Sequence, residues 1–248
     1  MIDIHCHLLP GIDDGPKSIE ESLAMARHAA NAGITKIVTT PHITPGRYDN
    51  SLASIQPVFE NLKATIKEQA IPLEISFAAE IRFDPVIIDM VNNDTLPVLG
   101  EYEGERIILL EFPHSHIPPG SEDLIQWLAD RGVRVLIAHP ERNGSVISNI
   151  EKITPLVKMG CLLQITAGAL TGVFTEAPRK CAMELLKRGW VSIIASDAHN
   201  IHARCPELEP ARQEAAKIVG EEEASDMVMS RPASTAKMHF ESSQTSSP

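Results

Sequence analysis

Apolar runs and helix-like patterns alternate along the whole chain. Seven mainly apolar runs of five to seven residues are predicted strands: 2–6, 34–40, 73–79, 107–111, 133–138, 161–166 and 191–196. Between several of them lie stretches with helical periodicity: 18–31, 51–69, 122–131, 149–158 and 178–188. Strands that alternate with helices indicate βαβ units and a parallel sheet. Because the runs are apolar on both faces, we expect helices to cover this sheet.

The segment 18–31 shows the local signals of a helix most clearly. Ser18 and Glu21 have the spacing of a capping box, in which each side chain bonds the backbone N–H of the other residue. Leu23 and Ala26 fall on one face, and Gly33 stands just past the end, where a left-handed residue commonly terminates a helix. A helix is therefore expected to connect the first two predicted strands.

The pattern predicts a single domain. Two segments interrupt it, 43–50 (ITPGRYDN) and 112–120 (FPHSHIPPG), whose prolines and glycines predict loops. A chain of 248 residues with 43% hydrophobic residues is long for one domain but ordinary for an α/β barrel. Residues 233–248, which become polar and low in complexity from Ser242, are predicted to be a disordered tail.

Side chains that commonly bind metal ions stand at the ends of the predicted strands. His5 and His7 alternate on the first strand and therefore point to one face. Later runs lead into His42, Glu80, Glu111, His139, Asp197 and His199. In a closed barrel the carboxyl ends of all strands meet at one rim, so we expect these eight side chains to converge. Asp14, in the sequence Asp-Asp-Gly-Pro, is a ninth candidate, although that sequence is also a good turn.

Nitrogen and oxygen ligands without thiolates favour a catalytic centre that holds manganese, iron(II), cobalt or zinc. One ion needs three or four protein ligands, so the set is large enough for two or three ions. Taken singly, His42 is more often an ordinary loop residue, and Glu80 and Glu111 are also typical ion-pair acids. The position of five of the ten histidines at strand ends favours metal binding. His114 and His116 repeat the spacing within a proline-rich loop, where surface residues or substrate contacts are expected.

Net charge and hydropathy bear on which partners the protein can bind, and the cysteines bear on its cellular compartment. The formal net charge of −11 disfavours nucleic acid, because it would repel phosphate backbones. No apolar stretch approaches the ~20 residues that cross a bilayer, so direct membrane insertion is not expected. The chain starts without a basic and apolar leader, and its cysteines lie far apart: Cys6, Cys161, Cys181 and Cys205. We expect a reduced, cytoplasmic protein, and the pattern favours no particular oligomeric state.

Several short motifs together resemble one known family. They are His5-Cys6-His7, Asp14-Gly15-Pro16, Pro41-His42, Glu80, Glu111, His139-Pro140-Glu141-Arg142 and Ser196-Asp197-Ala198-His199-Asn200. The chain resembles the PHP family, named for polymerase and histidinol phosphatase, and within it the bacterial tyrosine-protein phosphatases encoded beside capsule and exopolysaccharide genes. The resemblance covers residues 1–232, and it implies that they form one domain, a distorted seven-stranded (β/α) barrel of TIM-like type. It also implies three metal ions, usually manganese, held by the nine candidates named above.

The same resemblance implies arginines at the rim, namely Arg142, Arg204 and Arg47. Asn143 and Cys205 depart from the usual pattern, in which an aromatic residue and a second proline are common. The expected activity is hydrolysis of protein phosphotyrosine by a hydroxide that bridges metal ions, with a guanidinium neutralising the phosphoryl oxygens. The partner that the resemblance implies is a tyrosine autokinase of polysaccharide export.

Other activities remain alternatives. A histidinol phosphatase, or another small-molecule phosphomonoesterase, would share the metal ligands and differ in the rim pocket. A polymerase-type nuclease is disfavoured by the acidic composition, and an amidohydrolase would usually have a lysine where glutamates stand. A non-catalytic docking module would be expected to lose ligands or arginines. A cysteine phosphatase needs Cys-x5-Arg, and the residues six positions after the four cysteines are Ile12, Ala167, Lys187 and Ala211.

Overall fold

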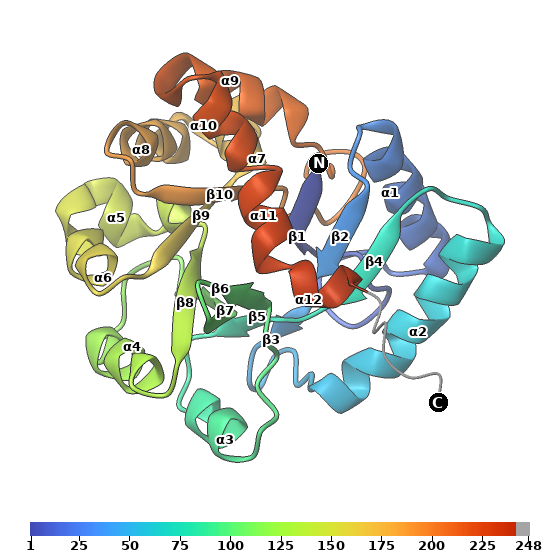
Figure 1. The fold of residues 1–248 in the computed structure, drawn as a ribbon, viewed down its shortest axis with the longest axis horizontal. Coiled ribbons are helices and arrows are strands. Elements are labelled where there is room, and N and C mark those ends of the chain that lie inside the picture. Colours follow the sequence, from blue (N-terminus) through green and yellow to red (C-terminus); the bar gives the residue numbers. More distant parts are fainter. Residues whose placement is uncertain (242–248) are drawn as a thin grey trace.

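A computed structural model describes residues 1–241 of the chain. Strands gather at its centre and most helices lie outside them (Figure 1). The strands are β1 (Ile2–Cys6), β2 (Lys36–Thr39), β3 (His42–Ile43), β4 (Glu74–Phe77), β5 (Glu80–Arg82), β6 (Gly100–Tyr102), β7 (Glu105–Glu111), β8 (Val133–Ala138), β9 (Leu162–Thr166) and β10 (Val191–Ala195). The helices are α1 (Ile19–Asn31), α2 (Leu52–Glu68), α3 (Val86–Asn92), α4 (Ser121–Ala129), α5 (Gly144–Ser148), α6 (Thr154–Lys158), α7 (Ala167–Thr171), α8 (Glu176–Lys187), α9 (Glu209–Val219), α10 (Glu221–Asp226), α11 (Ser230–Thr235) and α12 (Lys237–Phe240).

The strands form two parallel sheets with the orders β1-β2-β4 and β10-β9-β8-β7-β5-β3, and β6 pairs antiparallel with β7. The two sheets continue one register. Lys36 pairs with Glu74 in the first sheet and His42 pairs with Glu80 in the second, so the offset is 38 residues in both (36 to 74 and 42 to 80). The predicted α/β fold with a parallel sheet is therefore confirmed.

A strand occupies most or all of each of the seven predicted runs, and β7 begins two residues before its run. The runs 34–40 and 73–79 contain β2 and β4, and the short strands β3 and β5 extend them after a break. On the opposite side of the arrangement, Cys6 of β1 forms a parallel bridge with Ala198, just after β10. These junctions favour the interpretation as a distorted seven-stranded barrel.

Apolar side chains pack on both sides of the strands. One cluster joins Val38 of β2, Leu109 of β7, Leu136 of β8 and Ile193 of β10. Because these strands are not all neighbours, this cluster lies inside the curved sheets, and we call it the inner cluster. A larger cluster fills the space between the strands and the helices, and includes buried residues of α1, α2, α4 and α8. The sheets thus have an apolar core on each face.

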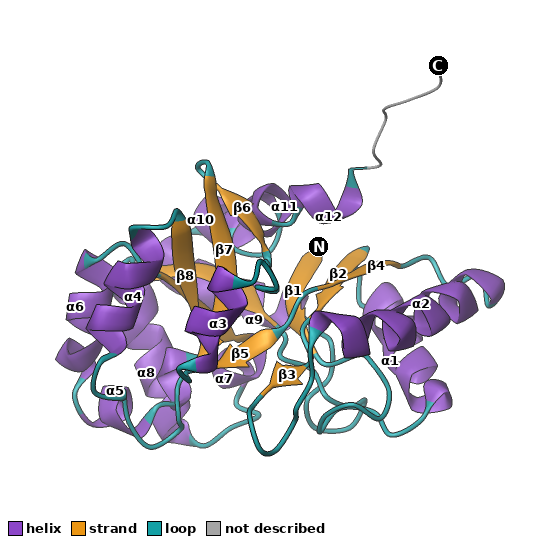
Figure 2. Ribbon diagram, turned by 90° about the horizontal axis from the view of Figure 1, so that it is seen from below, coloured by secondary structure: helices purple, strands orange, loops and turns teal. Residues whose placement is uncertain are grey.

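The C-terminal helices cover the amino ends of the strands, opposite β3 and β5 (Figure 2). Ala236 belongs to the inner cluster, and Phe240 packs against it. His239 Nε2 donates to the carbonyl of Leu99 at 3.1 Å. The prediction of a disordered tail from residue 233 is wrong for residues 233–240, because their apolar side chains contact the strands. The polar end from Ser242 lies outside the described residues.

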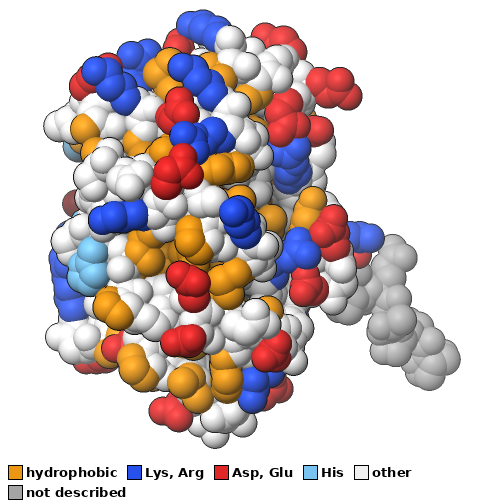
Figure 3. Space-filling view, turned by 90° about the vertical axis from the view of Figure 1, so that its left-hand side faces the viewer, with side chains coloured by type: hydrophobic (Ala, Val, Ile, Leu, Met, Phe, Trp, Pro, Cys, Tyr) orange, Lys and Arg blue, Asp and Glu red, His pale blue; other side chains and the backbone are white. Residues whose placement is uncertain are grey.

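Within residues 1–241, no helix is long and apolar enough to cross a membrane. On the face drawn in Figure 3, basic and acidic side chains are interspersed with apolar ones. That face therefore carries no extended field of a single sign.

Candidate metal centre

The ends of β1 and β10 hold the first candidate ligands together. The Asp197 N–H donates to the His5 carbonyl at 2.8 Å, and the His7 N–H donates to the Ala198 carbonyl at 2.9 Å. Asp197 and His139, which follow β10 and β8, have left-handed backbones with φ of 51° and 33°. Residues other than glycine rarely adopt this conformation, and those that do are concentrated at functional sites.

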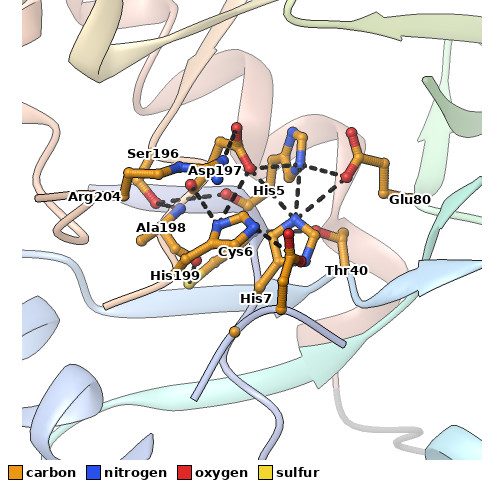
Figure 4. A network of polar contacts seen from close by, with 12 residues as sticks. His5, Cys6, His7, Thr40, Glu80, Ser196, Asp197, Ala198, His199 and Arg204 are labelled. Atoms are coloured by element: carbon orange, nitrogen blue, oxygen red, sulfur yellow. Dashed lines mark hydrogen bonds and ion pairs between the residues drawn. The ribbon is translucent and has the colours of Figure 1, made fainter. Parts of the chain in front are cut away.

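Four buried side chains direct ligand atoms to one point (Figure 4). His5 Nε2 and His7 Nε2 are 3.4 Å apart. Each lies 3.3 Å from Glu80 Oε2 and 3.3 Å from Asp197 Oδ1. Four atoms that surround one ion tetrahedrally at about 2.0–2.1 Å are themselves about 3.3–3.4 Å apart. The spacing of these atoms therefore fits a divalent transition-metal ion.

The second ring nitrogen of each of these histidines is held by another side chain. His5 Nδ1 lies 2.7 Å from Gln164 Oε1, and His7 Nδ1 lies 2.7 Å from Asp13 Oδ2. Both oxygens accept, so the Nδ1 atoms carry the protons and the Nε2 lone pairs face the point between the ligands. This pattern is typical of histidines that bind metal ions.

Two further groups of side chains adjoin the first. Asp14 Oδ1 lies 3.4 Å from His42 Nε2 and 3.3 Å from His199 Nε2, and His7 belongs to the same group. His42, Glu80 and Glu111 form the other group. His139 lies beside that last group, with Nε2 2.9 Å from Glu80 Oε1 and 4.0 Å from Glu111 Oε1. The structure thus brings all nine candidate ligands together.

Electrostatics within these groups favour a cation. Glu80 Oε2 and His42 Nδ1 are both buried without a hydrogen-bond partner and lie 3.1 Å apart. Burial and the charge of Glu80 raise the pKa of Glu111 to about 7, although Arg82 opposes this shift. Burial and the charge of Arg142 lower the pKa of His139 to about 4, which leaves its ring neutral. Crowded carboxylates and neutral imidazoles are a suitable donor set for divalent metal ions.

The candidate ligands Asp14, His42, Glu80, Glu111, His139, Asp197 and His199 line a cavity of about 240 Å³. Arginines also line this cavity. Arg142 and Arg204 each donate to Asp197 Oδ2 at 2.5 Å. Although burial opposes ionisation, the charges of Arg204 and His5 lower the pKa of Asp197 well below its usual range. Arg47, the third predicted arginine, also lines the cavity and lies over the ring of Tyr48 at 4.9 Å. The cavity walls therefore offer several guanidinium groups to an anion.

Three further residues of this site were not predicted from the sequence. Asp13 holds His7, although the sequence singled out only its neighbour Asp14. Gln164 holds His5, and its position as a polar residue inside an apolar run was the available signal. Arg82 binds Glu111 at 2.9 Å and lines the cavity. It stands two residues after Glu80 on the same strand, so strand alternation places both side chains on one face.

The class that the fold and the site define is an α/β protein with candidate metal ligands at the carboxyl ends of its parallel strands. Two solved structures share the fold alone. The lactonase Lmo2620 from Listeria monocytogenes has a TM-score of 0.56 at 13% identity, with 94% of this chain and 93% of that chain covered. A mutant organophosphorus hydrolase from Deinococcus radiodurans has a TM-score of 0.55 at 16% identity, with 94% of this chain and 91% of that chain covered.

The family itself follows from more similar proteins. The family model described as capsular polysaccharide synthesis, CpsB/CapC, matches residues 1–237. Tyrosine-protein phosphatase YwqE of Bacillus subtilis (strain 168) is 36% identical over 205 residues, which cover 82% of this chain and 79% of the relative. Tyrosine-protein phosphatase CpsB of Streptococcus pneumoniae is 30% identical over 241 residues, or 94% and 96% of the two chains. The chain belongs to the CpsB/CapC family.

A solved structure supports this membership. It belongs to the crystal structures of YwqE from Bacillus subtilis and CpsB from Streptococcus pneumoniae, two proteins called unique metal-dependent tyrosine phosphatases. Its TM-score to this chain is 0.88 at 32% identity. The similarity covers 96% of this chain and 94% of that one. The resemblance to capsule-associated tyrosine phosphatases is thus confirmed.

Proposed function

We propose that this protein is a metal-dependent protein-tyrosine phosphatase of capsular or exopolysaccharide synthesis. The observation that carries the proposal is the set of four buried ligand atoms, with the two histidine nitrogens 3.4 Å apart and each 3.3 Å from both carboxylate oxygens. Relatives with this activity in their names align over most of the chain.

The proposal assigns two or three divalent ions, with manganese as first choice and iron, cobalt or zinc as alternatives. The first group of ligands is His5, His7, Glu80 and Asp197, the second is His7, Asp14, His42 and His199, and the third is His42, Glu80, Glu111 and His139. When bound, such ions activate water and neutralise phosphoryl charge.

The arginines would bind and orient the phosphoryl group. Asp197 holds Arg142 and Arg204 at one edge of the cavity, so their remaining N–H groups are fixed before substrate arrives. Planar guanidinium groups bind two phosphoryl oxygens at once, and they stabilise charge that develops in the transition state. A phenol leaving group, with a pKa near ~10, needs less protonation than an alkyl alcohol does. The site therefore suits an aryl phosphate.

The cysteines do not suit nucleophilic catalysis. A cysteine nucleophile needs a lowered thiol pKa. Burial instead raises the pKa of Cys161 and that of Cys181 to about 12, and burial and Glu207 raise the pKa of Cys205. These features favour direct hydrolysis without a phosphocysteine intermediate.

We further propose a bacterial tyrosine autokinase as the protein substrate and the cytoplasm as the location. The substrate follows from the resemblance to capsule-associated phosphatases, and the location from four cysteines that lie far apart in the sequence, as is typical of a reducing compartment.

A side-by-side assay tests the function. Protein reconstituted with manganese is given a phosphotyrosine peptide, a phosphoserine peptide and histidinol phosphate, before and after chelation, and metal content is measured on the same samples. We expect two to three ions per chain and rapid hydrolysis of the phosphotyrosine peptide alone, lost on chelation and restored by manganese. Faster hydrolysis of histidinol phosphate would replace the proposal with its small-molecule alternative, and full activity after chelation would refute metal dependence.

A further inference from the structure

A second cavity of about 200 Å³ lies beside the metal centre and shares only Arg204 with it. Its walls include Gly168, Val173, Phe174, Ala203 and Pro210. None of the nine candidate metal ligands lines it. Polar residues also line it, namely Thr166, Thr171, Ser196, His202 and Glu207, but the larger part of the exposed wall is apolar. This cavity can therefore accept an apolar side chain.

One wall of this cavity is the turn after α7, and it is closely packed. The Val173 N–H donates to the Gly168 carbonyl at 2.9 Å. A Cβ atom on Gly168 would lie 3.2 Å from Val173 Cβ and 3.3 Å from Phe174 Cε2, so a larger residue there would push the turn outward by a few tenths of an ångström. Val173 nevertheless remains 48% exposed, although it is a large apolar residue. The turn thus holds an apolar side chain at the cavity in a fixed position.

The opposite wall is the loop after β10, and one side chain organises it. Asn200 Oδ1 accepts from the N–H groups of His202, Ala203 and Arg204 at 3.0, 2.8 and 3.2 Å. The carbonyl of Arg204 in turn accepts from the His199 N–H at 3.0 Å. Both walls are therefore formed before any ligand binds, which lowers the entropic cost of binding.

One wall contacts Arg142 of the metal centre, and the other carries Arg204. Phe174 lies under Arg142, with Cζ 4.7 Å from the ring centroid. Arg204 reaches from its wall to Asp197. Arg204 lines both cavities. A phosphoryl group held by this arginine would therefore lie within about the length of one arginine side chain of the second cavity. A substrate that occupies the metal centre has this cavity as its immediate neighbour.

The spacing of side chains in an extended peptide matches this arrangement. Alternate side chains point to the same face and lie about 6.6 Å apart along the strand, whereas the adjacent side chain points away. We propose that the second cavity binds an apolar side chain two residues from the phosphotyrosine of an extended peptide substrate. This inference rests on the proposed tyrosine phosphatase function and adds a sequence preference to it. Val173 is the residue that determines the preference.

The test compares three nonapeptides with one central phosphotyrosine: one with leucine two residues before it, one with leucine two residues after it, and one with serine at both positions. The fourth substrate is p-nitrophenyl phosphate, which has no flanking residue. The enzymes, all loaded with manganese, are the unmodified protein, Val173→Asn, Val173→Ile and the control Met229→Asn. Met229 is 47% exposed and precedes α11 at the opposite end of the strands. The asparagine is uncharged, so it does not alter long-range attraction of the phosphate.

For the unmodified protein we expect one leucine peptide to have a kcat/KM roughly tenfold above the serine peptide, as burial of an apolar side chain in a fitted pocket commonly gives. Val173→Asn should remove that preference and leave p-nitrophenyl phosphate turnover unchanged. Val173→Ile and Met229→Asn should keep the preference.

Three results would overturn the inference. Equal kcat/KM for the three peptides would mean that the cavity binds no flanking side chain. An equal loss on p-nitrophenyl phosphate and peptides in Val173→Asn would mean that the cavity holds the phenyl ring or supports the arginines. A loss of preference in Met229→Asn would show that the effect is not local. Absence of activity on every aryl phosphate would instead refute the proposed function, and this inference with it.

Discussion

The two ends of the strand arrangement differ in what their side chains do. At the carboxyl end, imidazoles and carboxylates lie within 3.3–3.4 Å of one another, and left-handed backbones at His139 and Asp197 hold two of them. At the amino end, Ala236 and Phe240 close the inner cluster with apolar contacts. Strain and crowded charge cost stability at the first end, while apolar burial adds stability at the second.

This contrast means that substitutions at the two ends should separate activity from stability. A site residue should change chemistry and leave the fold, because the strands that hold it are packed on both faces. A residue of the C-terminal helices should change stability and leave chemistry. Four substitutions, from the largest expected effect to the smallest, test this separation.

Asp197→Ala should have the largest effect on activity. Its Oδ1 faces the ligand histidines and its Oδ2 holds both Arg142 and Arg204, so one truncation removes a candidate ligand and releases two arginines. We expect kcat/KM to fall by roughly a thousandfold or more and the bound metal to decrease. Kinetics, metal analysis and thermal unfolding of the same samples measure this. Asp226→Ala, at the amino end, is the matched control and should retain near-normal turnover. An unfolded Asp197→Ala protein would contradict the separation.

Arg142→Ala should lower turnover by roughly a hundredfold without loss of metal, because the guanidinium is expected to contact the phosphoryl group rather than an ion. Arg142→Lys should recover little, since an ammonium group lacks the planar fork. The comparison is Arg134→Ala, which loses pairs with Glu103 and Glu105 on the surface and should change turnover less than about threefold. Near-normal kcat in Arg142→Ala would remove this arginine from the mechanism.

The sequence predicted the carboxyl end much better than the amino end. Strand positions followed from apolar runs, and the convergence of the nine candidate ligands followed from their place at or near the ends of those runs. Asp13 and Gln164, which bind the second ring nitrogens of His7 and His5, were not predicted. Which side chain reaches a ring nitrogen depends on the tertiary structure and not on the local sequence. Nothing in the local pattern distinguishes a residue that orients a ligand from one that serves as a ligand.

The amino end was mispredicted because its signals are tertiary. Residues 233–240 are too few for a long amphipathic pattern, and α11 and α12 span only six and four residues. Helices this short are not stable alone, so contacts with the strands must stabilise them. Similarly, the segment 149–158, predicted as one helix, is a 3₁₀ turn over Ile150–Ile153 followed by α6. Local periodicity located that segment but did not specify its helix type.

Gly100→Ala should have the largest effect on stability. A Cβ atom at Gly100 would lie 1.8 Å from the carbonyl oxygen of Thr235, so the substitution must displace α11 from the strands. We expect destabilisation of about 3 kcal/mol, seen as a lower unfolding temperature, with normal kcat/KM at temperatures where the protein stays folded. Gly104→Ala is the matched control: its backbone is left-handed but nothing lies within 4 Å, so about 1 kcal/mol is expected. Equal losses in both variants would show that the contact with α11 is unimportant.

His239→Gln should have the smallest effect, and that effect should depend on pH. Burial lowers the pKa of His239, although the hydrogen bond to Leu99 opposes the shift. Below the ordinary histidine pKa of about 6.5, the unfolded chain therefore binds a proton that the folded protein does not, so this residue stabilises the fold less as the pH falls. The stability advantage of the unmodified protein over His239→Gln should shrink between pH 8 and pH 5.5.

Denaturant unfolding at both pH values measures that difference, in which titration of the metal centre cancels because both proteins share it. Met238→Gln is the control: it lies on the same helix, is 57% exposed and does not titrate, so its stability difference should not change with pH. A difference for His239→Gln that is the same at both pH values would mean that the imidazole is not buried against the strands. The C-terminal helix would then owe its position to Ala236 and Phe240 alone. The amino end would be purely apolar in its energetics, and the contrast with the carboxyl end would become sharper.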